Sequence, residues 1–136
     1  MLTGIDPLLT GQLLKILDEM GHSDHIAIVD ANFPAHRVGA LVIEAPGIHI
    51  VPMVKAIRQV MALDDAYSPV LMDSGQATLP HVQRDILEAC GDTPYRLIDR
   101  WEYYALTQGA SAVVATGELR LWANVTLYKG IAYQTH

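Results

Sequence analysis

The chain has 136 residues, 51% hydrophobic and 7% aromatic, which is enough apolar surface for one compact domain with its own core. Nine Lys and Arg against 15 Asp and Glu give a formal net charge of −6, and this argues against a nucleic-acid surface, because phosphate neutralisation needs clustered cations. The start of the chain lacks the pattern of a signal peptide, and no run approaches about 18 apolar residues. We therefore expect a cytoplasmic protein with no membrane or nucleic-acid partner.

The first half of the chain predicts two helices and two strands. A helix over about 10–20 begins at the N-cap Thr10, and Gly21 has the left-handed freedom to end it. The following elements are a buried strand at 26–29, a brief strand at 40–44 and an amphipathic helix over 51–63.

The second half continues the alternation of strands and helices. The predicted elements are a strand at 70–72, a helix from Pro80 that Gly91 stops, a strand at 95–98, a helix from the N-cap Asp99 to Gln108, and strands at 112–115 and 124–128. This order predicts a single α/β domain over residues 1–136, with a largely parallel or mixed central sheet and helices on both faces. The last two strands have no obvious helix between them, so we expect the edge of the sheet that they form to be mixed or antiparallel.

One cysteine, Cys90, cannot form an internal disulfide. It lies on the apolar face of the helix that follows Pro80. We expect a buried, unreactive thiol, with a reactive one as the alternative.

The segment from Glu19 to His36 crowds three histidines and two aspartates around the strand at 26–29. Asp30 leaves the carboxyl end of that strand, which is where ligands bind in open α/β sheets. His22 lies in a tight connection, and an imidazole titrates near neutral pH, so it is a candidate proton donor. The alternatives are a hydrogen-bonded loop histidine and a turn-capping carboxylate.

His22, Asp24 and His25 are candidates for a metal site, because His-x-x-His spacing can bring two imidazoles to one ion. A polar bend needs no ion, however, and structural zinc sites usually require four nitrogen or sulfur ligands. We therefore expect no metal and assign Asp24 to a turn. Signatures of dinucleotide sites, Walker loops and serine-hydrolase elbows are also missing, which argues against nucleotide cofactors and serine hydrolysis.

Blocks spread over nearly the whole chain resemble the D-ribose pyranase and L-fucose mutarotase family. They are Gly4-Ile5-Asp6-Pro7-Leu8-Leu9, Met20-Gly21-His22-x-Asp24, Asp30-Ala31-Asn32-Phe33-Pro34-Ala35-His36, Arg100-Trp101-Glu102-Tyr103-Tyr104, Thr116-Gly117-Glu118, Trp122-Ala123-Asn124 and Lys129-Gly130. The fucose branch is the nearer match. Residues from about 45 to 95 match only in pattern.

The resemblance implies an isomerase that interconverts the anomers of L-fucose or a related monosaccharide, without a cofactor. It implies that His22 donates a proton and that the substrate-binding residues are Asp30, Arg100, Trp122, Ala123 and Asn124. It also implies an α/β sandwich that forms a decameric ring, with sites between neighbouring subunits. The alternative for Arg100 is that it lies in the first turn of a surface helix and forms an ion pair there.

Trp122 departs from the family, whose sugar-contacting tripeptide normally begins with tyrosine. Indole has one N–H donor and no useful titration, so Trp122 either stacks on a sugar or is a core or interface residue. Candidates for the missing hydroxyl are Tyr103, Tyr104 and Tyr128, and candidates for residues behind the site are His25 and His36.

Two further functions therefore stay open. One is a sugar-binding protein with little catalysis, because Trp122 replaces the tyrosine. The other is a non-enzymatic ring-forming or regulatory subunit of a carbohydrate pathway, which needs no affinity for a monosaccharide.

Overall fold

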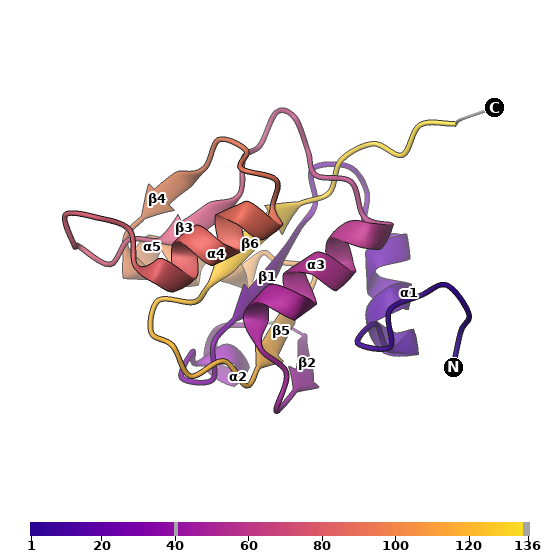
Figure 1. Ribbon diagram of the computed structural model, residues 1–136, viewed down its shortest axis with the longest axis horizontal. Helices are drawn as coiled ribbons and strands as arrows, with labels where there is room; N and C mark the ends of the chain where they lie inside the picture. The colour runs from indigo at the N-terminus through magenta and orange to yellow at the C-terminus, as the bar shows by residue number, and fades with distance from the viewer. Residues whose placement is uncertain (40, 135–136) are drawn as a thin grey trace.

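The computed structural model describes residues 1–39 and 41–134 as one α/β domain built on a six-stranded mixed sheet (Figure 1). The elements in chain order are α1 Gly11–Glu19, β1 His25–Val29, α2 Ala35–Val38, β2 Val42–Ala45, α3 Ile50–Val60, β3 Val70–Met72, α4 His81–Ala89, β4 Arg96–Ile98, α5 Arg100–Gln108, β5 Val113–Thr116 and β6 Val125–Tyr128. This confirms the predicted fold class.

The strand order is β2-β5-β1-β6-β3-β4. β5 pairs in parallel with β1 and β2, and β3 pairs in parallel with β4, whereas β6 is antiparallel to both of its neighbours. The sequence correctly indicated an antiparallel strand after residue 116, but its predicted place was wrong. β6 lies inside the sheet, between β1 and β3, because the helix-free connection from β5 crosses the carboxyl end of β1 before the chain turns back.

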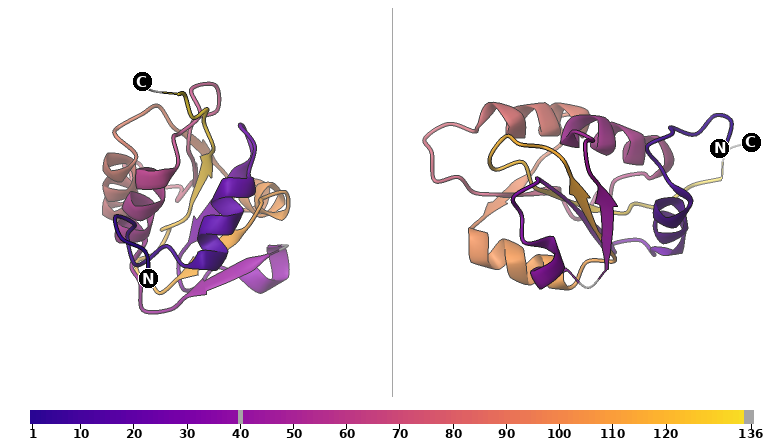
Figure 2. Two further views of the ribbon diagram at one scale, coloured as in Figure 1. Left: turned by 90° about the vertical axis from the view of Figure 1, so that its right-hand side faces the viewer. Right: turned by 90° about the horizontal axis from the view of Figure 1, so that it is seen from below.

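Helices cover both faces of the sheet, with α3 and α4 on one side and α2 and α5 on the other (Figure 2). Alternate residues of β1 point to opposite faces, so Ile26 and Ile28 join the core cluster under α3 and α4, and Ala27 and Val29 join the cluster under α5. Burial on both faces explains why β1 reads as a continuous apolar run. No helix within residues 1–39 and 41–134 has the length and apolar character to cross a membrane.

The start of α1 was predicted correctly, but its end was not. Thr10 caps the helix, and its side chain accepts a hydrogen bond from the Leu13 N–H. At the other end, Met20 is the C-cap in an extended conformation, and the left-handed residue is Ser23, with φ of 70°, not Gly21. The terminal carbonyls are satisfied by Lys129 instead, whose Nζ donates to the Leu17 and Met20 oxygens at 2.7 and 2.6 Å. Because Lys129 is far from this helix in the sequence, no local pattern predicts how the helix ends.

Several other boundaries shift. α3 begins one residue before the predicted helix over 51–63 and ends at Val60, and β2 ends at Ala45, one residue beyond the predicted strand at 40–44. Residue 40 lies outside the described residues. α2 was not predicted, because four residues are too short to show a helical period. The start of a helix after Pro80, the N-cap Asp99 and the helix stop at Gly91, with φ of 84°, are confirmed.

Cys90 is fully buried in the core cluster beneath α3 and α4. Burial raises the pKa of its thiol to about 11, so the thiol stays protonated near neutral pH. The expectation of a buried thiol is confirmed, and the lack of reactivity stays a prediction, which the raised pKa supports because the thiolate is the nucleophilic form.

Candidate functional site

A cavity of about 280 Å³ opens at the end of the sheet where β1, β3 and β4 finish and β6 begins. The residues that line it are Asp30, Asn32, Phe33, Met72, Arg100, Tyr104, Leu121, Trp122 and Asn124. The structure thus brings together four of the residues predicted from the sequence, namely Asp30, Arg100, Trp122 and Asn124.

The inverted direction of β6 explains this convergence. Ile28 of β1 and Leu71 of β3 both lie opposite Val125 of β6. Because β6 runs against both neighbours, the residue just before it, Asn124, lies beside the ends of β1 and β3. A parallel strand in this position would carry its leading residues to the opposite end of the sheet.

Asp30 and Asn124 form the buried polar floor of the cavity. The Asp30 backbone N–H donates to Asn124 Oδ1 at 2.9 Å, and the Asn32 N–H donates to Asp30 Oδ1 at 3.0 Å. Burial raises the pKa of the Asp30 carboxyl; hydrogen bonds from the backbone N–H groups of Asn32, Ala123 and Phe33 and from the Asn124 side chain oppose this rise without cancelling it. Asp30 is only 6% exposed, so its carboxylate is a fixed acceptor at the cavity floor.

Ala123 acts through its backbone. Its side chain is fully buried, and its N–H contacts the Asp30 carboxylate. The tripeptide Trp122-Ala123-Asn124 therefore supports Asp30 as well as lining the cavity.

Trp122 has a left-handed backbone, with φ of 66°, which is unusual for a bulky residue. Its carbonyl accepts a hydrogen bond from Gln83 Nε2 at 3.1 Å, and the same nitrogen donates to the Met72 carbonyl at 2.7 Å. The indole packs against the core cluster under α5 and also lines the cavity. Trp122 therefore packs in the core and also lines the cavity, and its stacking on a sugar stays a prediction.

Arg100 is the first residue of α5, at the rim of the cavity. Its Nε donates to the Tyr104 hydroxyl at 2.9 Å, and its guanidinium carbon lies 4.7 Å from the Trp101 ring centroid and 5.4 Å from that of Tyr104. Within residues 1–39 and 41–134 Arg100 makes no ion pair, so the alternative of a surface ion pair was wrong.

The three candidate tyrosines occupy different places. Tyr104 lines the cavity. Tyr103 is fully buried behind it, where its hydroxyl accepts from Thr126 Oγ1 at 3.1 Å and burial raises its pKa. Tyr128 is the last residue of β6, at the end of the sheet opposite the cavity, and its ring centroid lies 5.3 Å from those of both His25 and Tyr67. Only Tyr104, of these three, has access to the cavity.

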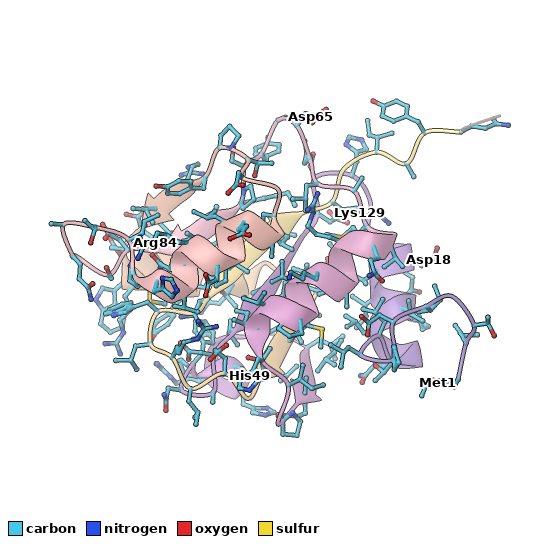
Figure 3. The ribbon with its side chains drawn as sticks, in the orientation of Figure 1. Met1, Asp18, His49, Asp65, Arg84 and Lys129 are labelled. Atoms are coloured by element: carbon cyan, nitrogen blue, oxygen red, sulfur yellow. The ribbon has the colours of Figure 1, made fainter. Side chains whose placement is uncertain are left out.

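His22 lines a second cavity, of about 530 Å³, at the end of the sheet where β1 begins. Asp64, Asp65 and Tyr133 also line it, and Asp65 marks this upper end of the molecule in Figure 3. A hydrogen bond from Ser23 lowers the pKa of Asp64, with a smaller contribution from the charge of His22. Five strand residues span about 16 Å, so His22 and Asp30 of one chain cannot contact the same sugar.

The other polar residues of this segment lie away from the first cavity. His25 Nε2 donates to the Leu106 carbonyl at 2.9 Å, and His36 is hydrogen-bonded to Glu44 on the surface. Asp24 accepts from the Gly21 N–H at 2.8 Å, which confirms its assignment to a turn. In residues 1–39 and 41–134, no group of three or more His, Cys, Asp or Glu side chains converges as a metal site would require.

The connection from β5 to β6 is held in place by Glu118. Its Oε1 accepts from the Ile50 N–H at the start of α3, and Arg120 bridges Glu118 Oε2 at 3.2 Å and Asp85 of α4 at 3.0 Å. Burial raises the pKa of Glu118, but the hydrogen bonds from Arg120 and Ile50 outweigh it, so the pKa lies below its ordinary value. His49, labelled in Figure 3, marks this end of the sheet.

Besides Asn32 and Phe33, which stood in a family block without a role, three residues at or behind the cavity were not predicted, namely Met72, Gln83 and Leu121. Met72 had a signal, because it ends a strand that is parallel to β1. Gln83 had a weaker one, since a polar residue stood three positions before Ile86 on the apolar stripe of α4. Leu121 had none, because an isolated leucine in a loop carries no pattern.

Residues 3–132 match the model of the RbsD / FucU transport protein family. The chain belongs to this family. The assignment made from the sequence blocks is thereby confirmed, and the match covers every residue of the first cavity and all but Tyr133 of the second.

Solved structures of RbsD and FucU proteins share the fold. The fucose mutarotase of Streptococcus pneumoniae, solved with L-fucose, superposes with a TM-score of 0.90 at 31% identity and covers 97% of this chain and 100% of its own. FucU of Bifidobacterium longum gives 0.89 at 29% identity, over 96% and 100%. Bacillus subtilis RbsD, solved with D-ribose, gives 0.82 at 26% identity, over 98% and 100%.

Proposed function

We propose that the protein is a monosaccharide mutarotase that interconverts the anomers of L-fucose or a related sugar. The observation that carries the proposal is the buried pair Asp30 and Asn124 beneath a cavity that Arg100 borders, in a chain of the RbsD / FucU family. A volume of about 280 Å³ is small for a ligand site, which suits a single monosaccharide ring.

The cavity offers complementary groups to a sugar. Asp30 accepts hydrogen bonds from sugar hydroxyls, whereas Arg100 donates through its guanidinium N–H groups. Trp122 presents an indole ring, which packs on the apolar C–H face of a pyranose. Asn124 and the Ala123 N–H hold Asp30 in place, so the carboxylate is oriented before the sugar arrives.

Mutarotation needs acid and base groups but no electron or group transfer. A proton is delivered to the ring oxygen, the anomeric hydroxyl loses a proton, and the C–O bond of the ring breaks to give an open-chain aldehyde. The carbonyl carbon rotates, and the same oxygen closes the ring on the other face. Positioned acid and base groups contribute about 10² to 10⁴ in rate to such steps, and no cofactor is required.

The proton donor in this proposal is His22, supplied by a neighbouring copy of the chain. No histidine lines the Asp30 cavity within the described part of the chain, and His22 stands at the opposite end of β1. Exposed apolar side chains border each cavity, with Leu121 64% exposed beside Asp30 and Tyr133 76% exposed beside His22. A ring-shaped homo-oligomer, which the family resemblance implies is a decamer, would bury these groups and bring the two cavities together.

Saturation-transfer NMR of anomer exchange tests the proposal. We expect the protein to accelerate exchange for at least one of L-fucose, D-ribose, galactose and rhamnose, and His22→Gln to lower that rate by about 10² or more. His36→Gln is the matched control, because His36 is an exposed histidine that contacts neither cavity, and it should exchange normally. Normal exchange in His22→Gln would remove His22 from the mechanism.

The second candidate is a sugar-binding protein with little catalysis, and Trp122 is the observation that favours it. An indole cannot relay a proton as a phenol can. Saturable sugar binding with exchange at the background rate would support this candidate over the mutarotase. Absence of binding to any sugar of the panel would contradict both and leave a non-enzymatic subunit.

A further inference from the structure

Tyr104 lies at the cavity rim, and within residues 1–39 and 41–134 no group accepts a hydrogen bond from its hydroxyl. Its oxygen accepts a hydrogen bond from Arg100 Nε at 2.9 Å. A phenol has one hydrogen to donate in addition to its acceptor positions. Because Arg100 can only donate, it occupies an acceptor position and leaves the Tyr104 O–H hydrogen free to turn toward the cavity.

The ring of Tyr104 is held firmly. Phe33 and Trp101 contact it edge to face, with centroids 5.3 and 5.6 Å away, and the Arg37 guanidinium lies 5.8 Å from its centroid. Contacts on several sides restrict the two side-chain torsions of a tyrosine, so little conformational entropy is lost when the hydroxyl makes a further hydrogen bond.

We propose that Tyr104 is a sugar-binding residue, whose O–H donates to a hydroxyl oxygen of the monosaccharide while Arg100 fixes its direction. The inference rests on the proposed function. It places the donors Arg100 and Tyr104 on α5 and the acceptor Asp30 at the end of β1, so the cavity selects a ligand with hydroxyls on both sides of one ring. It also supplies a phenol hydroxyl at the site, which Trp122 does not have.

Tyr104→Phe tests the proposal, because it removes the hydroxyl and keeps the packed ring. One neutral hydrogen bond corresponds to about a 2- to 13-fold change in affinity, and we expect a loss of this size in both sugar affinity and kcat/KM. Tyr103→Phe is the matched control on the adjacent residue. Its hydroxyl bonds to Thr126 in the core, so this variant should lower the melting temperature and leave sugar affinity unchanged.

Monodeoxy analogues of the sugar that exchanges fastest separate binding from a structural role. The unmodified protein should lose affinity for the one analogue that lacks the hydroxyl contacted by Tyr104, and Tyr104→Phe should bind that analogue and the parent sugar equally. A purely structural change would weaken all analogues alike and would overturn the proposal.

The role of Arg100 is tested by combining variants. If Arg100 directs the Tyr104 hydroxyl, Arg100→Lys and Tyr104→Phe should be non-additive in sugar affinity, with the double variant weaker than Arg100→Lys by less than twofold. Full multiplication of the two effects would contradict this part of the proposal. If the unmodified protein binds no sugar, the proposed function fails and the inference falls with it; if it binds sugar and Tyr104→Phe matches it, only Tyr104 is overturned.

Discussion

Asp30 shows a conflict between binding and stability. Burial raises the pKa of its carboxyl relative to the unfolded chain. The native state therefore holds the proton more tightly. The cost to native stability grows as the pH rises above the ordinary pKa of aspartate, and it reaches its full size once the pH exceeds the raised pKa. A sugar offers the hydroxyl donors that would offset this cost, which is typical of a group kept for binding.

Asp30→Asn should consequently stabilise the protein at pH 7 while weakening sugar binding. The amide keeps an Oδ1 to accept from the Asn32 N–H and removes the buried charge. We expect the melting temperature to rise by a few degrees, since about 1 kcal/mol corresponds to about 2–8 °C in a domain of this size class. The rise should shrink as the pH falls through the native pKa of Asp30, and disappear below the ordinary pKa of aspartate, where the carboxyl is protonated in both states. A melting temperature that falls at pH 7 would contradict this assignment.

Individual residues of the cavity were predictable to the extent that they lie next to the end of a strand. Asp30 and Asn124 stand at strand ends, and a strand end is visible in the sequence. Tyr103 and Tyr104 could not be told apart, because adjacent helical residues point about 100° away from each other and their direction depends on how α5 docks. That docking rests on core contacts of Tyr103 with β3 and β6 residues distant in the sequence.

The connection from β5 to β6 depends on α4. Gln83 donates to the carbonyls of Trp122 and Met72, and Arg120 of the connection pairs with Asp85. The left-handed conformation of Trp122 is strained for a side chain of its size, so these contacts hold a backbone that would otherwise relax.

Gln83→Met should therefore loosen the tripeptide without unfolding the domain. Methionine has a similar length but no N–H, so two carbonyls lose their donor, at a cost of about 1–3 kcal/mol in the free energy of unfolding. We expect a lower melting temperature and weaker sugar binding. Binding is measured by the quenching of tryptophan fluorescence. The control is Arg84→Met on the exposed side of the same helix, labelled in Figure 3, which should change neither quantity. Equal sugar affinity in both variants would show that Gln83 does not position Trp122.

Among the helices and strands, existence and type were predictable and arrangement was not. Periodicity and caps located most of the elements, with α2 too short to leave a pattern. The interior position of β6 depends on pairing with β1 and β3, which no local pattern encodes. This pairing creates the cavity, so the site could be assembled from the sequence only through resemblance to a family.

The complete molecule carries the two halves of the proposed site at opposite ends of β1. His22 belongs to one cavity and Asp30 to another, about 16 Å of strand apart. The proposed mechanism therefore requires a second copy of the chain. In a closed ring built from one repeated, head-to-tail contact, every Asp30 cavity would receive a His22 from the same side.

Co-expression of two inactive variants tests this arrangement directly. In a ring made only of His22→Gln chains every site lacks the histidine, and in a ring made only of Asp30→Asn chains every site lacks the carboxylate. Each variant alone should therefore show exchange near background. If each site takes His22 from one chain and Asp30 from another, a site is intact when an Asp30→Asn chain supplies the histidine and a His22→Gln chain supplies the carboxylate. This holds for about one quarter of the sites in randomly mixed rings, so two differently tagged variants, purified on both tags, should recover about one quarter of the normal exchange rate. A co-assembled ring that stays inactive would show that each chain builds its own site, and the separation of His22 from Asp30 would then exclude His22 as the proton donor.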